Sequence, residues 1–126
     1  MAGYAVAHLD EIEEFADAGC HYRPIRHHLG ITAFGVTAWT ARAAGDLVIN
    51  EHDEGDPTAD QELFLVLRGH AVFELDGDRI DAPAGTLVFA PPHTQIHNGR
   101  ASLRSTARII AFAPSDSLPS PVPAIP

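Results

Sequence analysis

The chain has 126 residues, a formal net charge of −9, eight arginines and no lysine. This length suits a single domain with its own hydrophobic core rather than two domains. The acidic balance argues against nucleic acid or an anionic membrane surface as a partner, since both require basic patches. The lack of lysine excludes Schiff-base chemistry on that side chain.

The cysteine content and the hydropathy pattern bear on where in the cell the protein is expected. Cys20 is the only cysteine, so no disulfide can form within the chain, and a reducing, cytoplasmic setting is expected. No apolar run approaches the ~20 residues that a membrane-spanning helix requires, so no membrane partner is expected.

The first predicted element is a short helix near the N-terminus. Asp10 and Glu13 form a capping-box pattern, and Gly19 is the predicted end of the helix. From Tyr22 onward, short apolar runs separated by glycine and proline predict an all-β fold. The predicted strands cover residues 31–40, 46–53, 62–68, 71–76, 78–82, 86–90 and 103–112.

Alternation along 46–53 determines which polar side chains accompany the apolar ones. Four residues would share one face of this strand: Leu47, Ile49, Glu51 and Asp53. A carboxylate carried inward in this way would be protonated, paired with arginine or bound to a cation. A register shifted by one residue would instead turn His52 and Glu54 inward.

The central region carries two further signals. Residues 63–67 are apolar on both faces of the predicted strand, so one face needs a second layer or another subunit to cover it, which favours a homodimer. Asp76-Gly77 between two apolar runs predicts a two-residue hairpin turn, because glycine tolerates the positive φ of such turns.

The spacing of glycines and acidic residues resembles the first motif of the cupin family. In that motif a glycine is followed after five residues by His-x-His, and a later glutamate is followed after six residues by a second glycine. Gly45 holds the first glycine position, and Glu62 and Gly69 hold the last two. The two histidine positions are occupied here by Glu51 and Asp53.

A second cupin motif, Gly, five residues, Pro-x-Gly, two residues, His, matches in two competing registers. One begins at Gly77; the other begins at Gly85 and places His93 at the last glycine position and Ile96 at the histidine position. A slip of one residue would bring His97 to that histidine position. The segments Arg26–Ile31 and Glu51–Glu54 also resemble a group of small bacterial cupins.

The resemblance implies a double-stranded β-helix, which is two sheets rolled into a barrel with a pocket between them. We therefore expect an N-terminal helix and a strand leading into the barrel at 1–30. The cupin barrel itself would span 31–113, and a proline-rich flexible tail would span 114–126.

Metal-bearing cupins hold their ion with three histidines and one glutamate. Carried over to this chain, the metal ligands would be Glu62, His97, Glu51 and Asp53, with Glu51 and Asp53 also the candidate catalytic groups. An oxygen-rich set of this kind would hold one divalent ion such as Mn²⁺, Fe²⁺, Ni²⁺ or Zn²⁺, and the alternative is that no metal is bound.

Four residues are candidates for contacts with a substrate. Arg68 and Arg104 would clamp a carboxylate with their planar guanidinium groups, although a partnership with Glu62 or Asp53 is an equally open alternative. Phe64 would line the pocket, and His93 is the fourth candidate for a contact with the substrate.

Three functions remain open from the sequence. The first is a metal-dependent enzyme on a small organic substrate, of the oxygenase, isomerase, lyase or cyclase type. The second is a metal-free protein that binds a small molecule, with or without acid–base catalysis by its carboxylates. The third is an accessory protein whose pocket is degenerate, because the fold alone does not determine function.

Overall fold

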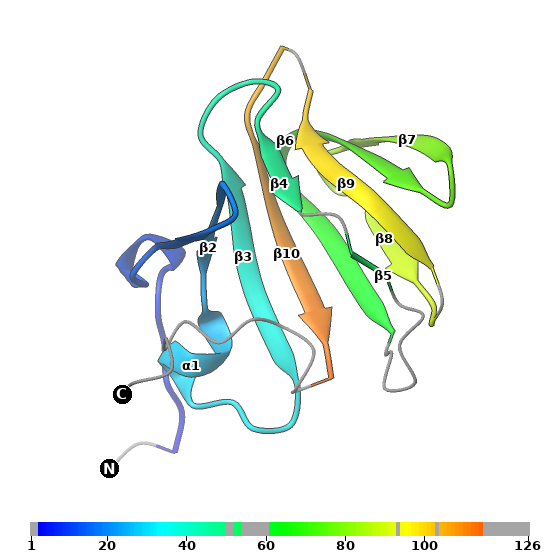
Figure 1. The fold of residues 1–126 in the computed structure, drawn as a ribbon. Coiled ribbons are helices and arrows are strands. Elements are labelled where there is room, and N and C mark those ends of the chain that lie inside the picture. The colour runs from blue at the N-terminus through cyan, green and yellow to red at the C-terminus, as the bar shows by residue number, and fades with distance from the viewer. Residues whose placement is uncertain (1–2, 50–51, 54–60, 93, 103, 115–126) are drawn as a thin grey trace.

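The computed structural model of the chain describes residues 3–49, 52–53, 61–92, 94–102 and 104–114. In these residues ten strands form one antiparallel sheet that curls on itself (Figure 1). The strands are β1 (Phe15–Asp17), β2 (Cys20–Arg23), β3 (Gly35–Ala41), β4 (Leu47–Ile49), β5 (His52–Asp53), β6 (Glu62–Leu75), β7 (Asp78–Pro83), β8 (Leu87–Ala90), β9 (Gln95–Ala101) and β10 (Ala107–Ala113). A 3₁₀ turn, Leu9–Glu11, and a short helix, α1 (Ile25–Leu29), precede β3.

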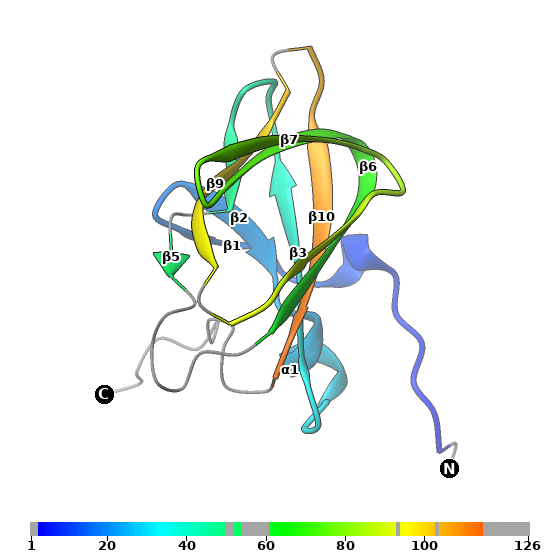
Figure 2. The same ribbon diagram turned by 90° about the vertical axis from the view of Figure 1, so that its right-hand side faces the viewer.

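The long strand β6 belongs to both walls of a barrel. Its first half pairs with β8 and β10, and β10 pairs with β3. Its second half pairs with β7 and β9, and β9 pairs with β4 and β5. Figure 2 shows β6 and β7 curving across the top from one wall to the other. The all-β, two-walled barrel predicted from the sequence is therefore confirmed.

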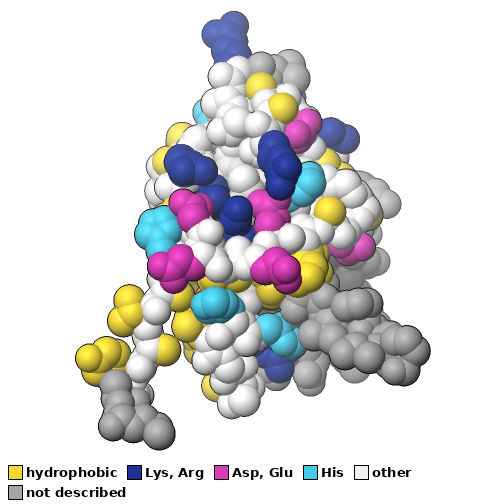
Figure 3. Space-filling view, turned by 90° about the vertical axis from the view of Figure 1, so that its left-hand side faces the viewer, with side chains coloured by type: hydrophobic (Ala, Val, Ile, Leu, Met, Phe, Trp, Pro, Cys, Tyr) yellow, Lys and Arg dark blue, Asp and Glu magenta, His cyan; other side chains and the backbone are white. Residues whose placement is uncertain are grey.

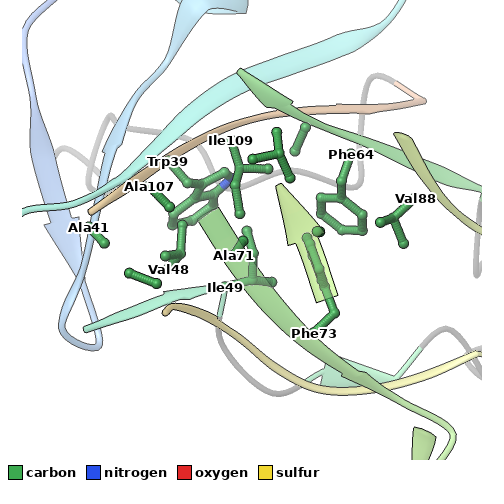
Figure 4. Packing of buried hydrophobic residues seen from close by; sticks show 14 of the residues in the cluster. Trp39, Ala41, Val48, Ile49, Phe64, Ala71, Phe73, Val88, Ala107 and Ile109 are labelled. Carbon is green, nitrogen blue, oxygen red and sulfur yellow. The ribbon is translucent and has the colours of Figure 1, made fainter. Parts of the chain in front are cut away.

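The interior is filled by alternate residues of the strands. On β6, Phe64 and Val66 are buried before the bend at Gly69, and Ala71 and Phe73 are buried after it. Because each half of β6 belongs to a different wall, the rings of Phe64 and Phe73 meet across the barrel with centroids 5.5 Å apart (Figure 4).

The hairpin predicted at Asp76-Gly77 is confirmed. Asp76 and Gly77 have φ values of 49° and 85°, and they join β6 to β7. The Asp76 carboxylate also accepts a hydrogen bond from the backbone N–H of Gln95, at 2.8 Å, which ties the turn to β9.

The helix predicted between Asp10 and Gly19 is wrong in position. This segment contains the 3₁₀ turn and the β1–β2 hairpin, in which Gly19 has a φ of 84° and forms the turn rather than a helix end. Phe15 and Tyr22 pair across the hairpin, so tertiary contact overrides a short helical pattern that is too weak to stand alone. The helix of this region is α1, which ends at Gly30 in the left-handed conformation.

Several predicted strand limits also differ from the structure. Residues 62–68 and 71–76 are one continuous strand, and the predicted strand 31–40 begins only at residue 35. The sequence did not predict β9, because a register shift interrupts the alternation of inward and outward residues along it. In addition, Gly99 has no side chain to mark an inward position. A methyl group at Gly99 would lie 3.1 Å from the side chain of Ile49, so β4 occupies that space.

The predicted strand 46–53 is split into β4 and β5. A register shift between Leu47 and Ile49 places Val48 and Ile49 both in the core, and Leu47 packs against the same core, so simple alternation of faces does not hold along β4. Residues 50–51 and the tail from residue 115 lie outside the described residues. No helix in the described part of the chain is long and apolar enough to cross a membrane.

Candidate functional site

Glu62 is the buried carboxylate of the described interior. It is the first residue of β6, it is 5% exposed, and it lies two residues before Phe64 on the inward-facing alternation. No other aspartate or glutamate among the described residues is buried. Removal of a carboxyl group from water is unfavourable, so its position inside the barrel mouth marks this end as a candidate site.

Small side chains surround Glu62. Ala90 pairs with it on β8, and Ala113 on β10 follows the residue that pairs with Leu63. One row deeper, Phe64 lies between Val88 and Ala111, and beyond that row the large side chains of Trp39 and Ile109 close the barrel (Figure 4). Side-chain size therefore increases from the Glu62 end toward the middle of the barrel.

Glu62 also borders a cleft of about 620 Å³. Its apolar lining includes Phe34, Leu63, Phe89 and Phe112, which belong to the outer side of the same wall. The carboxyl-bearing residue thus lies where the apolar core meets an apolar cleft, a combination typical of small-molecule sites.

Strand β5 pairs with β9 beside the point where a register shift interrupts β9. Ile96, at the histidine position of the second motif, is fully buried, and β5 places His52 opposite Ile96 and Asp53 opposite Gln95. On the other side of β9, Leu75 pairs with Ile96 and Glu74 pairs with Asn98, so His97 is the extra residue of a bulge.

Most of the predicted metal ligands cannot be assembled from the described residues. Glu51 lies outside them, as does the predicted substrate contact His93, and for Asp53 and His97 only the backbone in β5 and β9 is described. Within the described part, no three side chains of His, Cys, Asp or Glu are close enough to hold an ion. Of the four-residue ligand set only the Glu62 side chain belongs to the described part, so this set stays a prediction.

The predicted substrate contacts lie in three different places. Phe64 is 1% exposed and forms part of the wall beneath Glu62. Arg68 is exposed and lies six residues further along β6, roughly 20 Å away at the usual strand rise. Arg104 is exposed beyond the end of β9 and lines a different groove. The structure therefore brings Phe64, but neither arginine, to Glu62.

That second groove, of about 710 Å³, crosses the outer face of β7, β6 and β9. Its lining includes Arg79, Arg100 and Arg104, together with His70, whose Nε2 lies 4.0 Å from Asp81 Oδ1. Sequence reasoning missed this groove, although the hairpin register set by Asp76-Gly77 would have placed residues 72–74 beside residues 79–81.

An ion-pair network holds the N-terminal hairpin against the barrel. Glu14 contacts Arg23 at 3.2 Å and His21 at 3.4 Å, and it also accepts a hydrogen bond from Arg42. Figure 3 shows the face on which these charges of both signs gather. Nearby, burial raises the pKa of the Cys20 thiol to about 11, and the charge of Asp17 adds to the rise. None of these groups borders the Glu62 cleft.

Comparison with known proteins establishes the fold. No protein-family model and no curated protein matches the chain. Among solved structures, the polyketide cyclase RemF from Streptomyces resistomycificus is 17% identical with a TM-score of 0.72, over 92% of this chain and 82% of that one.

Two other solved structures agree. A cupin 2 conserved barrel domain protein from Salinispora arenicola is 18% identical with a TM-score of 0.71, over 92% of both chains. A Streptomyces PAC13 variant with uridine is 19% identical with a TM-score of 0.64, over 91% of this chain and 84% of that one. The cupin fold expected from the sequence resemblance is therefore confirmed, and at these identities the likeness concerns the fold alone.

Proposed function

We propose that this cupin-fold protein binds a small organic molecule inside the barrel, at the end where Glu62 lies. The observation that carries the proposal is the burial of Glu62 beside Ala90 and Ala113, with an aromatic wall beneath it. Glu62 also borders the 620 Å³ cleft, through which a ligand would reach it, and its desolvated surroundings strengthen any hydrogen bond that it makes.

The residues define the class of ligand. Phe64 offers a ring against which an apolar or aromatic body packs, and Glu62 offers oxygen acceptors for a hydroxyl or N–H group. An anionic ligand would be repelled by the carboxylate and by a chain with a net charge of −9. A neutral organic molecule with at least one hydrogen-bond donor is the best match.

The structural neighbours support this class. One of them is called a polyketide cyclase and another was solved with uridine, and both descriptions concern small organic molecules. The identities are too low to transfer either ligand, so the substrate is to be found by screening.

The test combines a ligand screen with a matched pair of variants. Neutral metabolites are screened by thermal shift, and each hit is titrated calorimetrically into wild type, Glu62→Gln and Glu74→Gln. Glu74 is the matched control, because it is the same residue type on the same strand but is exposed on the outer face.

We expect Glu62→Gln to weaken binding at least ~10-fold, because a charge-assisted hydrogen bond contributes about 1.5–3 kcal/mol. Glu74→Gln should bind as wild type does. Equal affinities in all three proteins, or a screen in which no neutral molecule binds, would contradict the proposed site.

A metal-dependent enzyme is the second candidate function. The observation that favours it is the bulge of β9 at His97, since bulges are frequent beside active sites. The ion would be held by Glu62 and His97, with Asp53 and Glu51 as further ligands, and when bound it would act as a Lewis acid.

Metal analysis of the tag-free protein decides between the two candidates. Mass spectrometry is performed before and after chelation and after Mn²⁺, Fe²⁺, Ni²⁺ or Zn²⁺ is added back. Retention of one ion per chain that is lost in His97→Ala but kept in His70→Ala would establish the second candidate. Absence of a retained ion and of a metal-dependent thermal shift would leave the organic ligand alone.

A further inference from the structure

The outer side of the β8–β6–β10–β3 wall is covered over only half of its width. Over β3 and β10, Val36, Ala38 and Ile110 are buried, because α1 and the segments beside it pack on them. Over β6 and β8 the described residues supply no such layer, and large apolar side chains face outward instead. We define the apolar face by its five exposed members: Phe34 (43%), Leu63 (36%), Leu67 (46%), Leu87 (62%) and Phe89 (54%).

The apolar face is continuous rather than a scatter of single residues. Leu63 pairs with Phe89 across the β6–β8 ladder, and Leu65 pairs with Leu87, so these side chains are direct cross-strand neighbours. Phe34 joins them through the cleft that it lines together with Leu63 and Phe89. Single exposed apolar residues are ordinary on a protein surface, whereas a contiguous patch of this kind marks an interaction site.

We propose that a second copy of this chain covers the apolar face, through a two-fold contact of the face with itself. At roughly 200 Å² for a fully exposed side chain of this size, its five members expose roughly 500 Å² of surface. A stable dimer buries about 800 Å² per partner, of which about 60% is apolar. The apolar face therefore has the area that the centre of such an interface requires.

The charge distribution agrees with this partner. The chain carries a net charge of −9, yet none of the five members of the apolar face is charged. Two copies can therefore bring their apolar faces together while their acidic residues stay in water, and a two-fold axis makes a self-complementary patch sufficient.

The contact would also bear on the proposed function. Glu62 lines the same cleft as Phe34, Leu63 and Phe89, so a partner seated on the apolar face lies beside the candidate site. This consequence rests on the proposed function, whereas the dimer itself does not, and the two are measured separately.

The test is the oligomeric state of full-length variants, measured by light scattering coupled to size-exclusion chromatography over a range of micromolar concentrations. The variants are Phe89→Glu and Leu87→Glu. The matched control is Ile80→Glu, because Ile80 lies on β7 in the other wall and is 36% exposed, as Leu63 is. Thermal melts of all proteins establish that each variant is folded.

We expect wild type and Ile80→Glu to have twice the chain mass of 13.5 kDa. Phe89→Glu and Leu87→Glu should be folded monomers, with a dimer dissociation constant raised at least ~100-fold, since two-fold symmetry repeats each substitution. A monomeric wild type would overturn the proposal, and so would folded Phe89→Glu and Leu87→Glu variants that remain dimers.

Discussion

Gly69 meets two requirements that no other residue type can meet together. It has a φ of 78° at the bend where β6 passes between the walls, and a Cβ atom there would collide with the backbone carbonyl of Thr106. We expect Gly69→Ala to lower the free energy of unfolding by at least ~2 kcal/mol, because both the strain and the collision must be relieved.

The control for this change is Gly77→Ala. Gly77 has a φ of 85° but no atom within 4 Å of the added methyl group, so only backbone strain of about 1–2 kcal/mol is expected. Urea unfolding of both variants measures the difference. Equal losses would show that the approach of Thr106 to Gly69 has no energetic consequence.

Cys20 makes the free energy of unfolding depend on pH in the alkaline range. Burial raises the pKa of its thiol from 9.0 to about 11, so between these values the folded state holds a proton that the unfolded state releases. The contribution to stability is therefore complete below pH 9 and is lost as the pH rises through 11. We expect the unfolding free energy of wild type to fall more steeply over this range than that of Cys20→Ala. Parallel slopes in urea titrations would contradict the raised pKa.

At the scale of elements, one carboxylate, that of Glu14, joins charged side chains of β2 to the arginine that follows β3. The Glu14 side chain is 14% exposed and contacts Arg23, His21 and Arg42, while Arg23 Nε and Nη1 are buried without another hydrogen-bond partner. We expect Glu14→Gln to lower stability by about 1–3 kcal/mol, because it leaves the buried Arg23 charge without its counter-ion.

Thermal unfolding measures this loss, and Glu13→Gln, an exposed neighbour, is the control. A melting temperature of Glu14→Gln equal to that of the control would mean that the network contributes nothing to the attachment of the hairpin.

The elements that the sequence predicts well are those with strong local signals. The hairpin at Asp76-Gly77 follows from residues that suit a positive φ, and the position of Glu62 follows from its spacing to Gly69. The helix expected after Asp10 fails, because Phe15 and Tyr22 contribute more as a cross-strand pair than as part of a short helix.

The remainder of the site could not be predicted, for a geometrical reason. Alternation assigns faces only while a strand is regular, and β4 and β9 each contain a shift that adds one residue. Such a shift exchanges the faces of all residues beyond it, and no local residue preference reveals it. For this reason the sequence could not separate Asp53 from His52, or Ile96 from His97, as the inward residue.

At the scale of the whole molecule, the sharing of β6 couples the two walls. Both walls lose pairings if β6 is lost, because β10 and β8 pair with its first half and β7 and β9 pair with its second. We expect a single cooperative unfolding transition. The fluorescence of Trp39, the only tryptophan, and the far-ultraviolet circular dichroism of the strands should therefore change together in urea. Two separated midpoints would contradict the coupling.

The central claim is that the ligand binds inside the barrel at Glu62. Amide chemical-shift mapping with a hit from the neutral-molecule screen tests it most directly, because it locates the ligand without any substitution. The account predicts that the largest shifts occur at Glu62, Phe64 and Ala113, at the Glu62 end of the barrel. Shifts confined to Glu74, Arg79 and Arg100, which line the outer groove, would place the ligand outside the barrel and contradict the account.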